Sequence, residues 1–322
     1  MMKPVLVGLA AAIIAAPALA DDAAPPPGLR LPAVLGGFPP QQVIEGVPEV
    51  RAHALELAGV PVARGRRVSL FNGRNLEEFT PWLGYANGTM FPTDEHDRPL
   101  GEQGMGDQFR VVEEEGAPAI YIVGKIWGSI NTRRDLGNYH LHLQFKYGRR
   151  WMEHDLQNSG VLFHSYGPYG AFAGTWMSAI EFEMQTGLLG MMVPIGRDIT
   201  TQVELGKGAG PGLFGGDNFY YMKGGKAAMV RLPTPVRQAS DAEKPIGQWN
   251  DLDLYAAGDQ AVFVVNGVPV MALSHIARVG TDGKSRPLTH GRVQLESEGA
   301  EVYMRDLWYE PIAAVPAVVL AR

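Results

Sequence analysis

Residues 139–147 alternate strictly between apolar and polar side chains, and no other segment limits the possible fold as strongly. Side chains of a β-strand project alternately to opposite faces of a sheet, so this segment predicts a strand that is buried on one face. No helical periodicity persists beyond a few turns anywhere in the chain, which disfavours a helical fold. The buried face is predicted to comprise Tyr139, Leu141, Leu143, Phe145 and Tyr147, and the polar face His140, His142, Gln144 and Lys146.

Glycine and proline divide the rest of the chain into short segments, with 40 glycines and 24 prolines among 322 residues. The Asn-Gly pairs at 72–73 and 266–267 are typical of tight hairpin turns. Many short strands joined by turns predict an all-β sandwich of two antiparallel sheets, in which the outer face of one sheet can carry a ligand. Further strands are predicted at 68–71, 119–123, 160–165, 179–185, 251–255, 261–265, 269–273, 292–296 and 302–309.

The first 20 residues have the features of a secretory signal peptide. Lys3 is followed by an apolar stretch over 5–16, and Ala18-Leu19-Ala20 fits a cleavage site. The apolar stretch is shorter than the roughly 20 residues that a spanning helix needs, although an uncleaved anchor is the alternative. We therefore expect cleavage near Ala20 and a secreted or periplasmic bacterial protein.

The remainder is predicted to hold one sandwich domain over 67–312, preceded by a proline-rich leader at 21–66. Residues 50–57 in this leader could form a short helix, and the C-terminal tail 313–322 is apolar but too short to span a membrane. A glycine-rich stretch with four aromatic residues, 206–225, is expected to form a mobile loop beside the ligand face.

Composition excludes several classes of function. The chain has no cysteine, which excludes disulfides, thiol catalysis and thiolate metal sites. Its net charge is −6, and the densest basic cluster is only Arg64, Arg66 and Arg67, so nucleic acid is not expected as a partner. The sequence leaves the oligomeric state open.

Two carboxylates are predicted to lie side by side on the strand at 179–185. Glu181, Glu183 and Gln185 share one face, and side chains two residues apart on a strand project about 6.5–7 Å from each other. Such a pair can act as acid and base, or as nucleophile and acid in a glycosidase, and mutual repulsion raises the pKa of one of them. Aromatic residues that suit stacking on sugar rings precede the strand, namely Tyr166, Tyr169, Phe172 and Trp176. The alternative is a solvated strand face.

His164 ends the preceding strand and is expected either to face the same cleft or to be a buried structural histidine. His142 and Lys146 add polar donors on a neighbouring face, and His140 with His142 could bind a divalent metal together with Glu181 or Glu183. No cofactor is required by any motif, since lipase, zincin, P-loop and dinucleotide signatures are all missing from the sequence. Arg292, Gln294 and Glu296 form one more polar face.

A series of motifs resembles the 3-keto-disaccharide hydrolase domain family across Val68–Ile312. This resemblance implies a concanavalin A-like jelly-roll sandwich, a secreted or periplasmic location and glycosides as substrates. The motifs are Leu70-Phe71-Asn72-Gly73, Asn158 to His164, Gly167-Pro168-Tyr169-Gly170, Trp176, Glu181-Phe182-Glu183, Gly247-Gln248-Trp249-Asn250, Val265-Asn266-Gly267, Gly291 to Leu295 and Val302-Tyr303-Met304-Arg305.

The chain departs from this pattern on the carboxylate strand. Laminarinase-type relatives of the fold carry E-x-D-x-x-E, whereas this chain has Glu181-Phe182-Glu183-Met184-Gln185 and lacks the third acid. The family usually has glutamine where Glu183 stands, which favours Glu181 as the functional carboxylate.

The resemblance implies chemistry at a sugar with a ketone at C3, which acidifies the C2 proton. Removal of that proton lets the enolate expel the C1 oxygen by β-elimination, and water can then add. His164 or Glu181 is the expected base, Lys146 or a bound cation would stabilise the enolate oxygen, and Glu181 could deliver a proton. Substrate contacts are expected from Trp176, Tyr166, Tyr169, His142, Gln185 and Gln294.

Three functions are therefore compatible with the sequence. The first is cleavage of 3-keto-glycosides, as hydrolase or lyase. The second is conventional glycoside hydrolysis by Glu181 and Glu183, and the third is lectin-like carbohydrate binding without catalysis.

Overall fold

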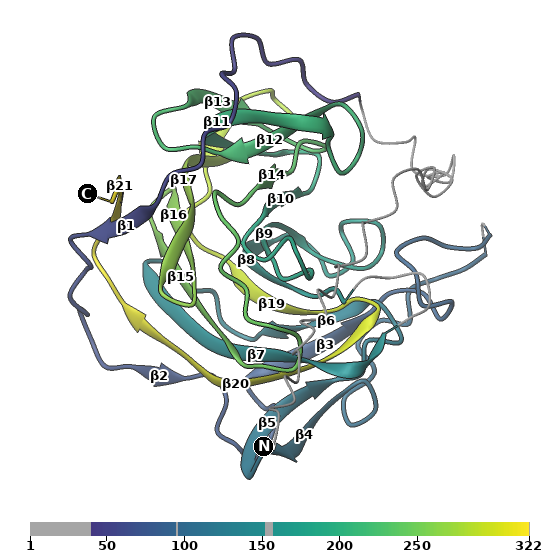
Figure 1. The fold of residues 1–322 in the computed structure, drawn as a ribbon. Coiled ribbons are helices and arrows are strands. Elements are labelled where there is room, and N and C mark those ends of the chain that lie inside the picture. The colour runs from purple at the N-terminus through teal and green to yellow at the C-terminus, as the bar shows by residue number, and fades with distance from the viewer. Residues whose placement is uncertain (1–39, 95, 152–156, 322) are drawn as a thin grey trace, which may run out of the picture.

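The computed structural model describes residues 40–94, 96–151 and 157–321, and it contains strands and turns but no α-helix within those ranges. Two curved sheets face each other in a sandwich (Figure 1). Almost all pairings are antiparallel; β12 and β14 form a parallel pair. The predicted all-β jelly-roll sandwich of two antiparallel sheets is therefore confirmed.

The front sheet, as we name it here, carries the candidate site described below. Its strands in spatial order are β3 (Phe79–Leu83), β6 (Gly128–Thr132), β19 (Arg292–Ser297), β8 (Gly160–Tyr166), β9 (Ser178–Glu183), β10 (Met192–Ile195), β14 (Val236–Arg237), β12 (Asp217–Tyr221) and β11 (Ile199–Pro211). Strand β13 (Lys226–Val230) pairs with the first half of β11, and β18 (Ser285–Pro287) is added through the end of β17.

The back sheet is built around the long strand that the sequence predicts most clearly. Its strands in spatial order are β4 (Phe109–Glu114), β5 (Ala117–Ile122), β20 (Ala300–Pro311), β7 (Tyr139–Trp151), β15 (Asn250–Ala257), β16 (Gln260–Val265) and β17 (Val268–Val279), and the short β2 (Val68–Ser69) also pairs with β20.

Strand β17 connects the two sheets, because its first half pairs with β16 and its second half pairs with β11. His275, at the change of partner, has a positive φ of 52°, a conformation that re-aims a strand.

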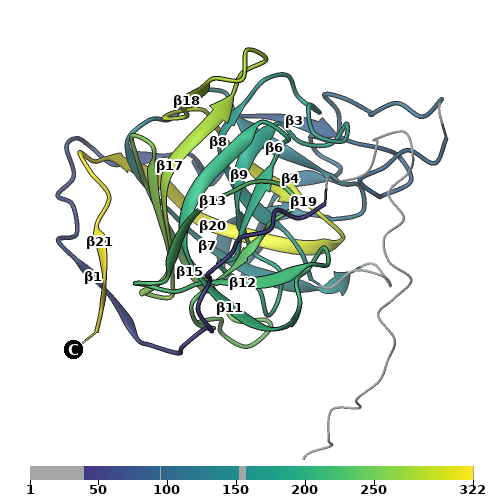
Figure 2. The same ribbon diagram turned by 90° about the horizontal axis from the view of Figure 1, so that it is seen from above.

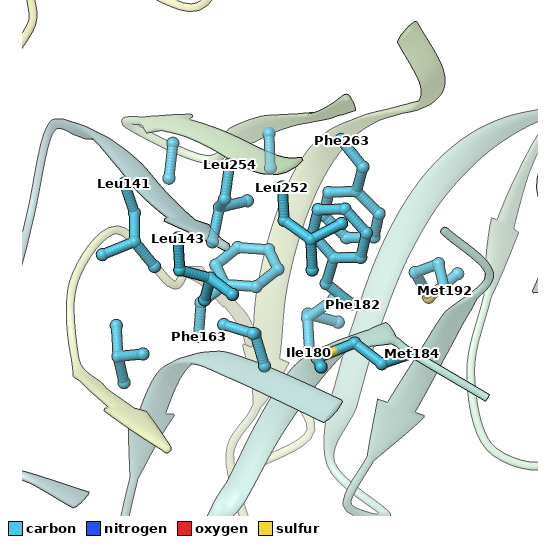
Figure 3. Packing of buried hydrophobic residues seen from close by; sticks show 14 of the residues in the cluster. Leu141, Leu143, Phe163, Ile180, Phe182, Met184, Met192, Leu252, Leu254 and Phe263 are labelled. Carbon is cyan, nitrogen blue, oxygen red and sulfur yellow. The ribbon is translucent and has the colours of Figure 1, made fainter. Parts of the chain in front are cut away.

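The core lies between the sheets and follows the alternation of the strands. Residues 139, 141, 143 and 145 of β7 are each about 1% exposed, as the sequence predicts. They meet Phe163 of β8 and Phe182 of β9 from the front sheet (Figure 3). Phe182 stacks on Phe263 of β16 with ring centroids 4.3 Å apart, and Phe163 meets the same ring edge-on at 5.8 Å. These three rings connect the two sheets.

Both ends of the described chain pack against the sandwich. Residues 55–58 form strand β1 (Leu55–Ala58), which pairs with β21 (Ala317–Leu320) in a separate two-stranded sheet, visible at one side in Figure 2. The prediction of a short helix at 50–57 is therefore wrong; Leu55 alternates with exposed neighbours and joins the core as a strand residue would. The predicted signal peptide at 1–20 and leader residues 21–39 lie outside the described residues.

The glycine-rich stretch 206–225 also differs from its prediction. It forms the end of β11 and all of β12, which pair as a hairpin, and only residues 212–216 make the turn. Close contacts with other groups require glycine in this hairpin. A side chain at Gly208, for example, would collide with the ring of Tyr220. Within the described ranges, no helix reaches the length and apolarity of a membrane span.

Phe263→Ala tests the importance of the inter-sheet aromatic contact. Loss of a fully buried ring leaves a cavity beside two other rings, so we expect the free energy of unfolding to fall by about 3–5 kcal/mol. Phe214→Ala, which removes a ring that is 42% exposed, is the control and should change stability little. Chemical denaturation measures both variants; equal effects would contradict the packing described here.

Candidate active site

Strand β9 places two carboxylates on the outer face of the front sheet. Ile180 and Phe182 point into the core, so Glu181 and Glu183 point the other way, as the sequence predicts. They line a cavity of about 290 Å³. This cavity, called the cleft below, is lined by Met90, Trp127, Asn158, Phe172, Trp176, Glu181, Glu183, Gln185, Val193, Ile195, Leu213, Phe214, Leu232 and Glu298.

Backbone amides hold Glu183 in one orientation. The N–H groups of Met184 and Gln185 both donate to Glu183 Oε1 at 3.0 Å. Burial and the charge of Glu181 raise the pKa of Glu183 well above its usual value, and the two amides oppose that shift. Glu183 is thus a fixed, desolvated carboxyl group at the cleft wall.

Glu181 belongs to a second group of carboxylates, which the folded chain assembles from two strands. One oxygen from each of Glu181, Glu296 and Glu298 lies within 4.8 Å of the others, and all three residues are buried. Glu296 comes from β19, which neighbours β8, and Glu298 follows that strand directly. We call these three residues the acidic triad.

Burial and mutual repulsion control the protonation of the acidic triad. Burial and the charge of Glu298 raise the pKa of Glu181 to about 8, whereas a hydrogen bond with Glu296 lowers it. Burial and the charges of Glu181 and Glu298 raise the pKa of Glu296 well above its usual value. A hydrogen bond between two carboxyl groups requires that one of them carries a proton, and the raised pKa values of Glu181 and Glu296 favour that protonated form.

Aromatic side chains also line the cleft. Trp176 contacts Trp127 at 5.6 Å and stacks with Phe172 at 6.5 Å between ring centroids. Its indole N–H donates to the carbonyl oxygen of Gly128 at 3.2 Å, which fixes the ring. Phe214, at the tip of the β11–β12 turn, is 42% exposed and also borders the cleft. Aromatic rings and carboxylates in one cavity suit a sugar ring, which has apolar C–H faces and polar hydroxyl edges.

The structure brings together four of the predicted site residues, Glu181, Glu183, Gln185 and Trp176. Sequence analysis missed the part that Glu298 and Trp127 play, and it placed Glu296 only on a polar face. Glu296 alternates with buried Leu295 of β19, so its outward orientation was visible in the pattern. Glu298 lies in the turn between β19 and β20, where no alternation applies.

Three predicted substrate contacts lie away from the carboxylates. Tyr166 and Tyr169 line another, larger cavity of about 460 Å³ together with Arg278 and Arg292, and this cavity contains none of the acidic triad. Gln294 has no exposed surface. Its side chain accepts from the amide of Met177 at 3.1 Å and donates to Ser165 Oγ at 2.9 Å, which makes it a structural residue. These positions correct the expectation that all three line the carboxylate cleft.

His164 does not face the cleft. The pairing of β8 with β9 shifts register between Phe163 and Tyr166, and His164 has a φ of 50°. This β-bulge turns the imidazole toward Tyr139 in the core, 6.3 Å away between ring centroids. Burial lowers the pKa of His164 to about 3, so it is neutral at ordinary pH. The expectation that it acts as a base in the cleft is corrected accordingly.

Lys146 and His142 lie on the outer face of the back sheet, on the far side of the core from Glu181. The Lys146 ammonium group lies 2.5 Å from a carboxylate oxygen of Glu114 and of Glu115. Because the core separates the two outer faces, Lys146 cannot stabilise an enolate in the cleft, and His142 cannot contact a substrate there. The same separation excludes a metal site that combines His140 and His142 with Glu181 or Glu183.

His140 and His142 instead share one half-buried acceptor. Both imidazoles donate to Asp253 Oδ1, at 2.7 and 2.8 Å respectively. Burial opposes ionisation of Asp253, but the hydrogen bonds from the two histidines outweigh it and lower its pKa to about 2. Burial alone would lower the pKa of His142, whereas Asp253, Asp306 and Asp251 raise it above its usual value. This ion cluster stabilises the back sheet.

Comparison with known proteins gives one family match. A family model described as the 3-keto-alpha-glucoside-1,2-lyase-like domain matches residues 66–310. No curated protein matches the chain by sequence.

Several solved structures are similar at low identity. A candidate glycosyl hydrolase from Parabacteroides distasonis is 15% identical, with 77% of this chain and 100% of that chain covered and a TM-score of 0.43. A second from the same organism is 16% identical, with 76% and 92% covered and a TM-score of 0.42. A β-glucanase from Bacillus licheniformis is 13% identical, with 78% and 100% covered and a TM-score of 0.35.

Asp253→Asn tests the ion cluster through the pH dependence of stability. A folded pKa of about 2 against 3.8 for the unfolded chain is a contribution of about 2 kcal/mol above pH 4, which is lost as the pH falls toward 2. The raised pKa of His142 adds stability that is complete below pH 6.5 and is lost as the pH rises through that pKa.

The difference in unfolding free energy between the wild type and Asp253→Asn should therefore be largest between about pH 4 and 6.5 and should narrow on both sides. Denaturant unfolding across this pH range measures it. Asp282→Asn, which removes an exposed ion pair with Arg286, is the control. A difference that does not vary with pH would contradict the assignment.

Proposed function

The chain belongs to the 3-keto-alpha-glucoside-1,2-lyase-like domain family, and from this premise we propose that it cleaves the glycosidic bond of 3-keto-glycosides. The reaction would take place in the cleft of the front sheet. The observation that carries the proposal is the pairing of desolvated carboxylates, Glu181 and Glu183, with an aromatic wall in one cavity. An oxidised sugar could stack on the wall and present its C1–C2 bond to the carboxylates.

The proposed reaction begins with proton removal at C2, which the neighbouring C3 ketone acidifies. A carboxylate takes the proton, the electron pair enters the enolate, and the enolate then expels the C1 oxygen. The leaving oxygen takes a proton, and addition of water to the resulting unsaturated ketone completes hydrolysis. We assign the proton transfers to Glu181 and Glu183, because His164 is buried and neutral on the other face of the sheet.

The geometry of β9 favours the assignment of the two proton transfers to two different glutamates. Adjacent outward positions on a strand are about 6.5–7 Å apart, so one carboxylate can reach C2 while the other reaches the C1 oxygen. Glu183 is already oriented by the amides of Met184 and Gln185, which limits the reorganisation needed when a substrate binds.

We also propose that the protein works outside the cytoplasm on a carbohydrate. The features of residues 1–20 suit export, and a cleft with apolar and acidic walls suits an uncharged glycoside. Gln185 lies in the cleft and is the best placed of the predicted amides to bind a sugar hydroxyl.

Turnover assays of Glu181→Gln and Glu183→Gln test the proposed chemistry. We expect the wild type to cleave a 3-keto-disaccharide and not its unoxidised parent, because only the ketone acidifies C2. Each substitution should lower kcat by roughly 10²–10⁴-fold, the usual contribution of a proton-transfer group. Glu204→Gln, which changes a surface carboxylate paired with Lys223, should retain activity. Cleavage of the unoxidised disaccharide would instead identify a conventional glycosidase.

Phe214→Ala tests whether the tip of the β11–β12 turn contacts the sugar. Loss of one stacking ring that is half exposed should raise KM several-fold and leave kcat nearly unchanged, since the ring binds the substrate and transition state alike. Ile246→Ala, which shortens another exposed apolar side chain outside the cleft, is the control. Equal KM values for the wild type and Phe214→Ala would show that this ring does not contact the sugar.

A further inference from the structure

Glu296 is a buried carboxylate that lacks a basic or amide partner to compensate its charge. It is 1% exposed, and apart from the carboxyl group of Glu181 neither of its carboxylate oxygens has a hydrogen-bond partner among the described residues. Both oxygens are thus removed from water with only another acid beside them, an arrangement that is costly for a charged group. Its nearest carboxylates, Glu181 and Glu298, add like charge.

Other buried glutamates of this chain have conventional partners. Glu183 accepts hydrogen bonds from the two backbone amides described above. Glu301, which is buried on the back sheet, forms an ion pair with Arg150 at 2.7 Å. The lack of a donor at Glu296 is therefore a local property of the acidic triad and not a general feature of buried acids in this fold.

The backbone beneath the acidic triad lets two of its carboxylates approach each other closely. A side chain on Gly160 would begin 2.5 Å from Glu181 Oε1 and 2.5 Å from Glu296 Oε2, so both oxygens lie above the Cα atom of this glycine. Glycine here allows the two carboxylates to come together over the strand. Glu181 and Glu298 also line the cleft, so the acidic triad is adjacent to the proposed substrate.

We propose that Glu181, Glu296 and Glu298 bind a divalent cation at the wall of the cleft. The ligand atoms are all carboxylate oxygens, which suit the hard cations Ca²⁺, Mg²⁺ and Mn²⁺. One oxygen from each residue gives three ligands, and the six or more positions of these cations leave the others for water or for sugar oxygens from the cleft. Each residue offers only one oxygen to the cation, so Glu181 keeps its other oxygen for proton transfer, and Glu183 stays outside the metal ligands.

Cation binding is to be measured on chelator-treated, full-length protein without any sugar. Titration with MnCl₂, CaCl₂ or MgCl₂ in a calorimeter is expected to give saturable binding of one ion, with a rise in Tm of several degrees at saturation. Glu296→Gln and Glu298→Gln should each weaken the binding by at least about 10-fold, as should Gly160→Ala, whose methyl group fills the space between two of the oxygens.

Glu301→Gln is the matched control, because it removes a buried carboxylate of the back sheet and should leave cation affinity unchanged. The proposal is overturned if none of the three cations binds saturably at millimolar concentration, or if Glu301→Gln weakens binding as much as Glu296→Gln. It is also overturned if Glu296→Gln raises Tm and the wild type shows no cation dependence, since that result identifies a shared proton.

This experiment separates the cation site from the proposed function. Glu183→Gln should lose turnover of the 3-keto-disaccharide but keep cation affinity, because Glu183 does not belong to the acidic triad. Cation binding without any cleavage would leave the metal site intact and reject the proposed reaction. Complete cleavage in the presence of chelator, together with no saturable cation binding, would leave the proposed reaction intact and reject the metal site.

Discussion

Strand β9 has to satisfy two environments at once, and the rest of the site depends on this constraint. Its inward side chains, Ile180 and Phe182, join the rings that hold the two sheets together. A strand projects successive side chains to opposite faces, so the packing that fixes Phe182 also fixes the directions of Glu181 and Glu183. The carboxylates are therefore positioned by a strand packed into the core and not by a loop.

Much of this arrangement could be predicted from the sequence, because alternation is a local property. The strand at 139–147 and the outward orientation of Glu181 and Glu183 follow from a period of two, and the proximity of Trp176 follows from its position just before the strand of these glutamates. The same rule failed at His164. Unbroken alternation from Gly160 places His164 on the cleft face with Leu162, but a bulge with φ of 50° turns it into the core. The bulge arises from the pairing of β8 with β9, and the order of apolar and polar residues along the sequence does not reveal it.

Lys146 and His142 show a second limit. Alternation correctly places them on a polar face, but a sandwich has two outer faces, and a period of two does not say which face carries a given strand. Glu298 shows a third limit. It enters the acidic triad through the pairing of β19 with β8, a contact between residues more than a hundred positions apart in the chain.

The two outer faces differ in how their partly or fully buried carboxylates are compensated. On the back sheet, Asp253 receives two histidines and Lys146 lies between two glutamates, so the charges there are balanced within the chain. On the front sheet, Glu296 has no basic group or backbone amide as a donor, and burial and the acids around it raise its pKa. Balanced charge stabilises a fold, whereas uncompensated buried charge costs stability and persists where a site needs it. The contrast therefore supports the proposal that the front face binds the ligand.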